Sequence, residues 1–353
     1  MFPRIVVDMK KLHENAERLV NMSKAQGINM YVVTKVHSAD LRLAQVCLDA
    51  GVYGLADSRI QNLEKLSVLG GEKVLLRLPM HSEVDKVVKF ADISFNSELS
   101  TIGKLNDAAK KIGVKHKILV MFDLGDLREG FLPEEVDVVI PEILKYENII
   151  IEGIGVNLTC YGGVIPSEEN LGELTRLAKH IESTYGIKLN IVSGGNSSSL
   201  YLLEKGELPK GINNLRVGEG IVLGREAAYG ELMKDMHDDA FILEAEIIEY
   251  KTKESMPKGQ IGMDAFGNKP SFVDKGIMKR GIVAIGRQDV EHTALFPLDP
   301  RIEIIGASSD HMLLDFTAVQ EDYKVGDVIK FKMEYSAMLK LFTSEFVDRI
   351  YLG

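Results

Sequence analysis

The sequence predicts an α/β protein: an N-terminal (β/α)8 barrel of the TIM type over residues 1–238, followed by a smaller C-terminal all-β domain over residues 239–353. Three observations predict it. The 353 residues exceed one hydrophobic core at about 150 residues per domain. Up to Asp238, short apolar strands alternate with amphipathic helices, which is typical of parallel sheets. Beyond Asp238, strand-like segments follow one another without long helices.

The barrel prediction depends on a pattern that occurs eight times. A first helix is indicated by Leu12, Ala16, Leu19 and Val20 at helical spacing, with Gly27 as its stop. The expected strands are 30–36, 52–56, 74–78, 92–95, 117–122, 149–156, 190–192 and 214–217. No GxGxxG turn follows the first of them, so the pattern favours a closed barrel over an open dinucleotide-binding sheet.

The second domain is predicted from its closely spaced strands. Turn signals such as VGD at 325–327 separate apolar segments of the kind found in small all-β domains. The segments are AFILEAEIIEYKT, RGIVAIG, IEIIGAS, MLLDFTAV and DVIKFKMEYS.

The charge of the chain argues against two classes of partner. Its 42 Lys and Arg against 52 Asp and Glu give a net charge of −10, the wrong sign for binding nucleic acid or anionic lipid. The two cysteines cannot build a disulfide framework or a cysteine metal site. No signal peptide or apolar run of roughly 18 residues is present, so we expect a cytoplasmic protein with a small-molecule substrate.

The active site of such a barrel lies at the carboxyl ends of its strands. Lys35 ends an otherwise apolar strand there, and an amine in apolar surroundings can act as a nucleophile or form a Schiff base. A lysine that simply extends its ammonium to the surface explains the position equally well.

Two glycine-rich turns follow strands seven and eight, SGGNSSS at 193–199 and VGEGI at 217–221. Glycines allow close backbone approach, and hydroxyls and free N–H groups bind phosphate oxygens. This corner of the barrel is its usual phosphate site. Arg216 closes strand eight. If its guanidinium faces a heteroaromatic ring nitrogen, this permanent cation would keep that nitrogen unprotonated. A structural ion pair is the simpler alternative.

Across nearly its whole length the chain resembles the alanine racemase family of fold-type III pyridoxal-phosphate enzymes, and within it the ornithine racemase branch. The segment VVTKVHSAD resembles the family's lysine motif, which implies that Lys35 forms the Schiff base with pyridoxal 5'-phosphate and serves as one acid/base. GGNSSS resembles the phosphate motif, with Asn196 and Ser197 as its pair. LRVGEGI implies contact of Arg216 with the pyridine nitrogen, and of the Gly218 and Glu219 backbone with phosphate.

Two further motifs imply substrate contacts. MFDLGDLREGF is similar to the segment whose arginine holds the substrate carboxylate, here Arg128. GASSDHMLLD is similar to a loop that lines the substrate pocket of the opposite subunit, here with Asp310. The resemblance therefore implies a homodimer with shared active sites, and no metal.

The chain also departs from alanine racemases at four positions. Arg287, in AIGRQDV, stands where the family has the tyrosine that acts as second base. Ala39 replaces a phosphate-contacting tyrosine, whose role His37 or Ser38 could take. The stacking histidine and the carbamylated lysine of the family are replaced by Asn157 and Met121. We therefore expect a substrate other than alanine.

The expected reaction interconverts the L and D forms of ornithine or a related basic or small amino acid. The acid/base on the face opposite Lys35 stays open among Cys160, Tyr161, Asp310, His311 and Arg287. An ornithine side chain brings an ammonium that needs an acidic partner, because an unpaired buried cation is costly. The candidates are Asp289, Asp310, Glu129 and Glu219.

Three other functions share parts of this pattern. A pyridoxal-phosphate decarboxylase of basic amino acids would carry an acidic partner for the pyridine nitrogen and a Glu-Pro-Gly-Arg segment, where this chain has Arg216 in RVGEG. A non-catalytic pyridoxal-phosphate carrier would be a bare barrel. A barrel aldolase would use Lys35 with a phosphorylated substrate and no cofactor.

Overall fold

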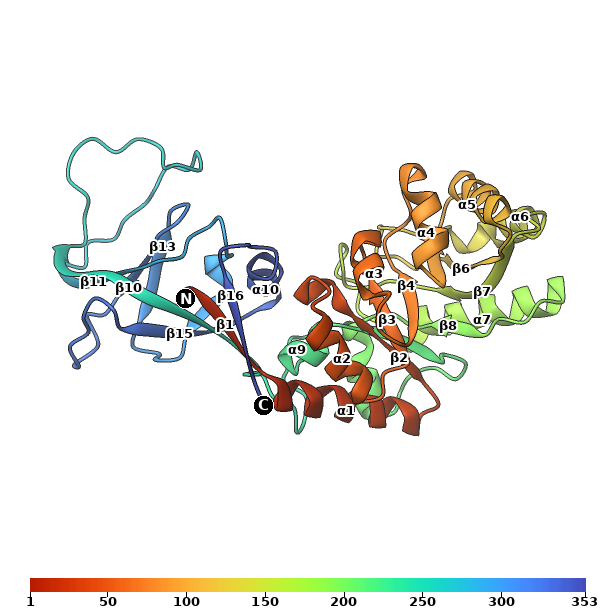
Figure 1. Ribbon diagram of the computed structural model, residues 1–353, viewed down its shortest axis with the longest axis horizontal. Coiled ribbons are helices and arrows are strands. Elements are labelled where there is room, and N and C mark those ends of the chain that lie inside the picture. The colour runs from red at the N-terminus through yellow and green to blue at the C-terminus, as the bar shows by residue number, and fades with distance from the viewer. The chain divides into compact units, whose positions relative to one another are not determined.

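A computed structural model describes residues 1–353, and its chain divides into two compact units (Figure 1). One unit comprises residues Lys10–Asp238, and the other comprises Met1–Met9 together with Asp239–Gly353. None of the helices combines the length and the apolar character needed to cross a membrane.

The larger unit is a closed barrel of eight parallel strands, hydrogen-bonded in chain order, with β2 pairing to β9 to close it. This confirms the predicted fold class. The strands are β2 (Asn29–Val33), β3 (Gly54–Asp57), β4 (Glu72–Leu75), β5 (Ile93–Asn96), β6 (His116–Met121), β7 (Ile149–Gly155), β8 (Ile191–Ser193) and β9 (Asn214–Val217). Because all eight run in one direction, the segments that follow them meet at one mouth of the barrel.

Helices connect consecutive strands, and their ends are set by local signals. In α7, Ser167 and Asn170 form a capping box, and Gly186 ends the helix in a left-handed conformation with φ +66°. In α2, the Asp40 side chain caps the first turn. The helices of this unit are α1 (Met9–Ala25, which begins in the other unit), α2 (Leu41–Asp49), α3 (Ile60–Leu66), α4 (Val84–Phe90), α5 (Leu99–Ile112), α6 (Val136–Leu144), α7 (Glu168–Tyr185), α8 (Leu200–Lys205) and α9 (Glu219–Leu223).

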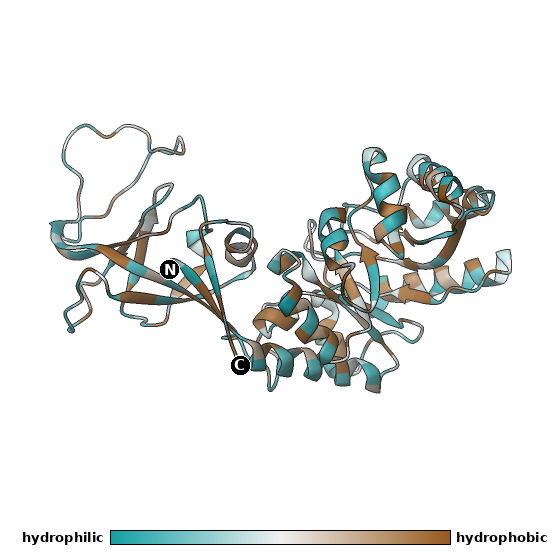
Figure 2. Ribbon diagram, in the orientation of Figure 1, coloured by the Kyte–Doolittle hydropathy of each residue, from teal (hydrophilic) through white to brown (hydrophobic).

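The barrel interior is filled by side chains rather than left open. Tyr31, Phe95, Leu119 and Met121 belong to one buried cluster drawn from several strands. Figure 2 shows helices banded in both hydropathy colours, as expected for helices that bury one face against the strands. The packed interior confines chemistry to the mouth.

The second unit is a mainly antiparallel sheet in the order β12-β15-β10-β11-β14-β13, to which β1 is added at β10 and β16 at β1. This agrees with the predicted all-β character, although one helix, α10 (Tyr335–Leu341), was not predicted. The strands are β1 (Arg4–Asp8), β10 (Phe241–Glu254), β11 (Ile277–Val283), β12 (Leu295–Pro297), β13 (Glu303–Ala307), β14 (Met312–Asp315), β15 (Val328–Met333) and β16 (Asp348–Leu352).

The first nine residues differ from the predicted division, which assigned residues 1–238 to the barrel. Strand β1 pairs antiparallel with β10 and parallel with β16, so it belongs to the β unit. Ile5 and Val7 are fully buried, and Arg4 forms an ion pair with Glu244 at 2.8 Å. The short apolar run in RIVVD is compatible with a strand but cannot reveal partners that lie more than two hundred residues away.

Candidate active site

Lys35 lies at the mouth of the barrel, immediately after β2. The strand ends at Val33, and Thr34–His37 form a single 3-10 turn, so the predicted strand 30–36 is too long by three residues. The chain leaves β2 because Ser38 and Ala39 adopt left-handed conformations and donate back to the carbonyls of Lys35 and Thr34. The Lys35 side chain is half-buried.

A buried carboxylate lies next to this turn. Asp57 ends β3 and accepts from Thr34 Oγ1 at 2.7 Å and from the Asn62 amide at 3.0 Å. Burial raises the pKa of the Asp57 carboxyl, while these hydrogen bonds and the charge of Lys35 oppose the rise. Asp57 therefore fixes the turn that carries Lys35, a role that the sequence did not reveal.

The segments after β8 and β9 meet at one oxygen atom. Ser197 Oγ accepts from the backbone N–H of Gly220 at 3.1 Å and of Gly218 at 3.4 Å. Both acceptor positions of this buried hydroxyl are used, so toward a bound anion it can act only as a donor. A Cβ on Gly218 would lie 3.0 Å from Val33 Cβ, so glycine permits this close approach.

Two neighbours complete this corner. Ser198 Oγ is buried and has no hydrogen-bond partner, which points to a group still to be bound there. Asn196 holds the turn: its Oδ1 accepts from Ser198 N, and its Nδ2 donates to the Leu158 carbonyl at 2.9 Å. Glu219 begins α9 directly after Gly218. The corner thus offers the hydroxyls of Ser197 and Ser198 as donors suited to a phosphate.

Arg216 is buried inside the mouth. Its Nη1 donates to Ser193 Oγ at 2.6 Å and its Nη2 to the Val156 carbonyl at 2.8 Å, while its guanidinium carbon lies 4.9 Å from the centre of the Phe95 ring. Burial lowers the pKa of the Arg216 guanidinium to about 10. The side chain therefore remains a cation at neutral pH.

Arg128 and Glu129 form an ion pair in the loop after β6. Both carboxylate oxygens of Glu129 accept from the guanidinium, one from Nε and the other from Nη2. Burial acts to lower the pKa of Arg128, but the bonds from Glu129 outweigh it and the pKa is raised. Asn157 accepts from Asn196 Nδ2 and donates to Glu129, and so links this loop to the phosphate-suited corner.

Asp126 joins the loop after β6 to the loop after β7. Its buried carboxylate accepts from four backbone N–H groups, those of Thr159 (3.0 Å), Cys160 (3.2 Å), Tyr161 (2.9 Å) and Val164 (3.2 Å). The role of Asp126 was not predicted, because no local pattern in the sequence reveals which backbone groups a loop carboxylate will bind. Cys160 Sγ lies 3.4 Å from Asn196 Nδ2, within the same cluster.

The predicted site residues of the β unit form a second group. The backbone N–H of Arg287 donates to the Ser308 carbonyl at 2.8 Å, and its guanidinium lies over the Phe266 ring. Asp310 is exposed on the adjoining turn, where a bond from His311 lowers the pKa of its carboxyl. Asp289, by contrast, is buried and accepts from Ser344 Oγ at 2.7 Å.

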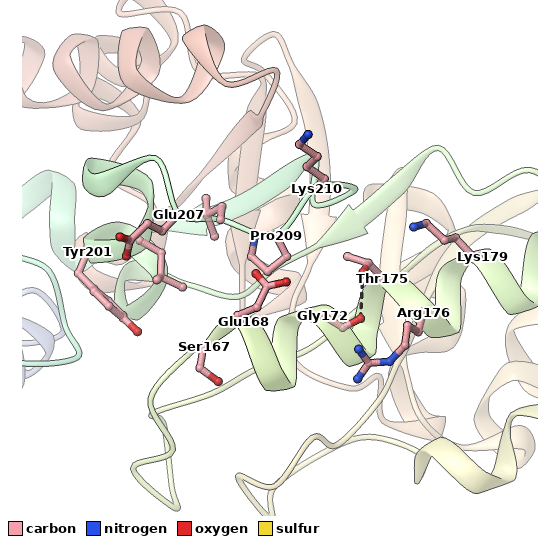
Figure 3. A pocket seen from close by; sticks show the side chains of 12 residues that line it. Ser167, Glu168, Gly172, Thr175, Arg176, Lys179, Tyr201, Glu207, Pro209 and Lys210 are labelled. Atoms are coloured by element: carbon pink, nitrogen blue, oxygen red, sulfur yellow. Dashed lines mark hydrogen bonds between the residues drawn. The ribbon is translucent and has the colours of Figure 1, made fainter.

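A large surface hollow lies away from all of these residues. Figure 3 shows it between α7 and the segment after α8, lined by Glu168, Arg176, Lys179, Tyr201 and Glu207 among others. No residue predicted for the site lines it. The structure also contains no cluster of His, Cys, Asp or Glu that could hold a metal ion.

Comparisons with known proteins agree on one family. The family model "Alanine racemase, N-terminal domain" matches residues 7–226. The chain is 51% identical to an ornithine racemase of Acetoanaerobium sticklandii over 350 residues, which cover 99% of each chain. It is 42% identical to a lysine racemase of Thermotoga maritima over 353 residues, again 99% of each.

Solved structures give the same fold at lower identity. The alanine racemase of Streptomyces coelicolor superposes with a TM-score of 0.76 at 15% identity, covering 99% of this chain and 98% of that one. The alanine racemase of Streptomyces lavendulae gives 0.75 at 15% identity, with 100% and 98% covered. Because both comparisons span nearly the whole chain, the likeness extends over the barrel and the β unit alike.

Proposed function

The chain belongs to the alanine racemase N-terminal domain family, and from this membership we propose that it is a pyridoxal-phosphate-dependent racemase of a basic amino acid, with ornithine as its preferred substrate. The full-length similarity to an ornithine racemase and a lysine racemase supports a diamino acid. The observation that carries the proposal is the meeting of Lys35, Arg216 and the Ser197 corner at one mouth of the barrel.

The residues at the mouth fit the cofactor on three structural counts. The orphaned Ser198 hydroxyl and the Ser197 hydroxyl suit the phosphate group, and Gly218, which has no Cβ, lets the backbone of this corner lie close to Val33. Buried Arg216 presents a cation to a ring nitrogen, and half-buried Lys35 presents an amine. Asn196, Gly218 and Glu219 complete the proposed cofactor contacts.

Pyridoxal phosphate, bound covalently through a lysine amine, acidifies the Cα–H bond of an amino acid by delocalising the resulting charge. In this chain Lys35 Nζ would remove or return that proton on one face. Arg128 would hold the substrate carboxylate and so orient the Cα–H bond. Arg216 is a cation at neutral pH, and it would keep a cofactor ring nitrogen unprotonated and so limit side reactions.

The opposite face needs a second acid/base. Within the barrel unit, Cys160 lies beside Asn157 and Asn196 and is a candidate. In the β unit, Arg287, Asp310 and His311 lie on adjoining turns and are candidates if a second subunit delivers them. We therefore propose a homodimer with shared active sites, in which Asp310 lines the partner's substrate pocket. We also propose that the protein is cytoplasmic.

Two measurements test the proposal. Purified protein is expected to be yellow, and borohydride should fix a pyridoxyl group on Lys35, as read by peptide mass spectrometry; colourless protein without this adduct would refute the cofactor. Incubation with single L-amino acids in deuterated water, followed by chiral chromatography, should give deuterated D-ornithine. Release of CO2 would instead identify a decarboxylase.

A further inference from the structure

The carboxylate of Glu129 occupies one of the two edges at which the Arg128 guanidinium can bind a carboxylate at two points. Its two oxygens pair with Nε and Nη2, which is the side-on, two-point geometry that arginine offers to carboxylates in general. An amino acid can bind to Arg128 in that geometry only by displacing Glu129. Substrate binding in that geometry therefore leaves the Glu129 carboxylate in need of another partner.

Glu129 cannot move far, because its loop is fixed at both ends and in the middle. Asp123 N donates to the Phe131 carbonyl at 2.9 Å, and Phe131 N donates to the Met121 carbonyl at 2.8 Å, which closes the base of the loop. Gly130 has φ +143°, and a Cβ there would lie 2.1 Å from Asp123 N. Asp126 anchors the middle of the loop through the four backbone bonds described above.

The surroundings of Glu129 also discourage an unpaired carboxylate. Only 17% of its side chain is exposed, and it lies within the electrostatic reach of both Arg128 and Arg216. Its other polar contact is the Asn157 amide at 3.4 Å. Once a substrate carboxylate has taken Arg128, the mostly buried Glu129 is therefore left without its strong partner, which is unfavourable.

We infer that Glu129 selects diamino acids by exchanging partners: the substrate α-carboxylate takes Arg128, and the freed Glu129 carboxylate binds the side-chain ammonium of the same molecule. This inference rests on the proposed function. An ornithine or lysine compensates for the ion pair that it breaks, whereas alanine breaks the pair and leaves Glu129 unpaired. Glu129 thus stabilises bound diamino acids, and the cost of breaking its pair with Arg128 weakens the binding of amino acids with an uncharged side chain.

Two of the other acidic candidates have hydrogen-bond partners within the β unit. Asp289 accepts from Ser344, and Asp310 pairs with His311. Of the acidic residues considered for the distal ammonium, Glu129 is the one bound to the proposed carboxylate arginine.

The test compares Glu129→Gln with a matched control, Glu134→Gln, an exposed glutamate just after the same loop. In both variants the side chain keeps its size but loses its charge. For E129Q we expect kcat/KM for ornithine to fall about 100-fold, mainly through KM, and kcat/KM for alanine to rise about tenfold, because Arg128 is freed. E134Q should match the wild type with both.

A binding measurement separates recognition from turnover. 2-Methylornithine and 2-aminoisobutyrate lack the Cα–H bond, so calorimetry reports binding of a diamino and a monoamino acid without racemisation. E129Q should weaken the first and strengthen the second. Equal loss for both ligands, or no change for either, would overturn the inference even if the wild type racemises ornithine. A wild type that racemises no amino acid would instead refute the proposed function.

Discussion

The guanidinium of Arg216 donates to the hydroxyl of Ser193 across 2.6 Å and so links the last two strands of the barrel. Ser193 in turn donates to Asn214 Oδ1. The Ser193 hydroxyl thus accepts from Arg216 and donates to Asn214, so its orientation is fixed. The Arg216 guanidinium is therefore held in place before any ligand binds. The cation that we assign to the cofactor ring is held by the barrel itself.

Replacing Arg216 separates its charge from its geometry. Arg216→Lys keeps a cation but cannot bind Ser193 and the Val156 carbonyl with one planar group. We expect R216K to lose about tenfold in kcat and Arg216→Gln at least about 100-fold, since the neutral side chain no longer controls the ring nitrogen. Racemisation of ornithine is the assay. Equal activity of R216Q and wild type would contradict the assignment.

The Ser197 hydroxyl is expected to contribute to cofactor affinity. Removing one hydrogen bond to a charged phosphate costs about 1.5–3 kcal/mol, so Ser197→Ala should raise the Kd for pyridoxal phosphate about tenfold to 100-fold. Titration of the apoprotein, followed by absorbance, measures this. Ser183→Ala removes an exposed hydroxyl on α7 and serves as control. An unchanged Kd in S197A would mean that this hydroxyl only caps Gly218 and Gly220.

The sequence was sufficient for the barrel but not for the details that connect its loops. Alternating strands and helices specify a parallel barrel, and parallel strands necessarily bring Lys35 and Arg216 to one mouth. Strand β1 was assigned to the wrong unit because five residues do not specify distant partners. The contacts of Asp126 and Glu129 depend on how two loops meet, which no local pattern encodes.

Asp126 should act as a positioning residue for the loops after β6 and β7. In Asp126→Asn, one oxygen becomes an NH2 group that faces backbone donors, so two of the four bonds are lost. We expect a loss of about 2–4 kcal/mol in the free energy of unfolding and a higher KM for ornithine with a smaller change in kcat. Urea titration and steady-state kinetics measure the two effects. Asp107→Asn, at an exposed position on α5, is the control.

His116 makes the stability of the barrel depend on pH. It is 3% exposed at the start of β6, where its ring contacts Ser94 Oγ at 2.8 Å, and burial lowers the pKa of His116 from 6.5 to about 4. Between these values the unfolded chain binds a proton that the folded chain does not. This contribution is therefore complete above pH 6.5 and is lost as the pH falls toward 4, by about 3 kcal/mol in total.

His116→Gln removes this titration and should flatten the fall in unfolding free energy between pH 6.5 and 4 relative to the wild type. Urea titrations of both proteins across that range give the difference directly, because the carboxylates that titrate there are common to both. Parallel curves for H116Q and wild type would show that the folded protein accommodates a charged His116. The burial of His116 would then not explain the loss of stability at acid pH.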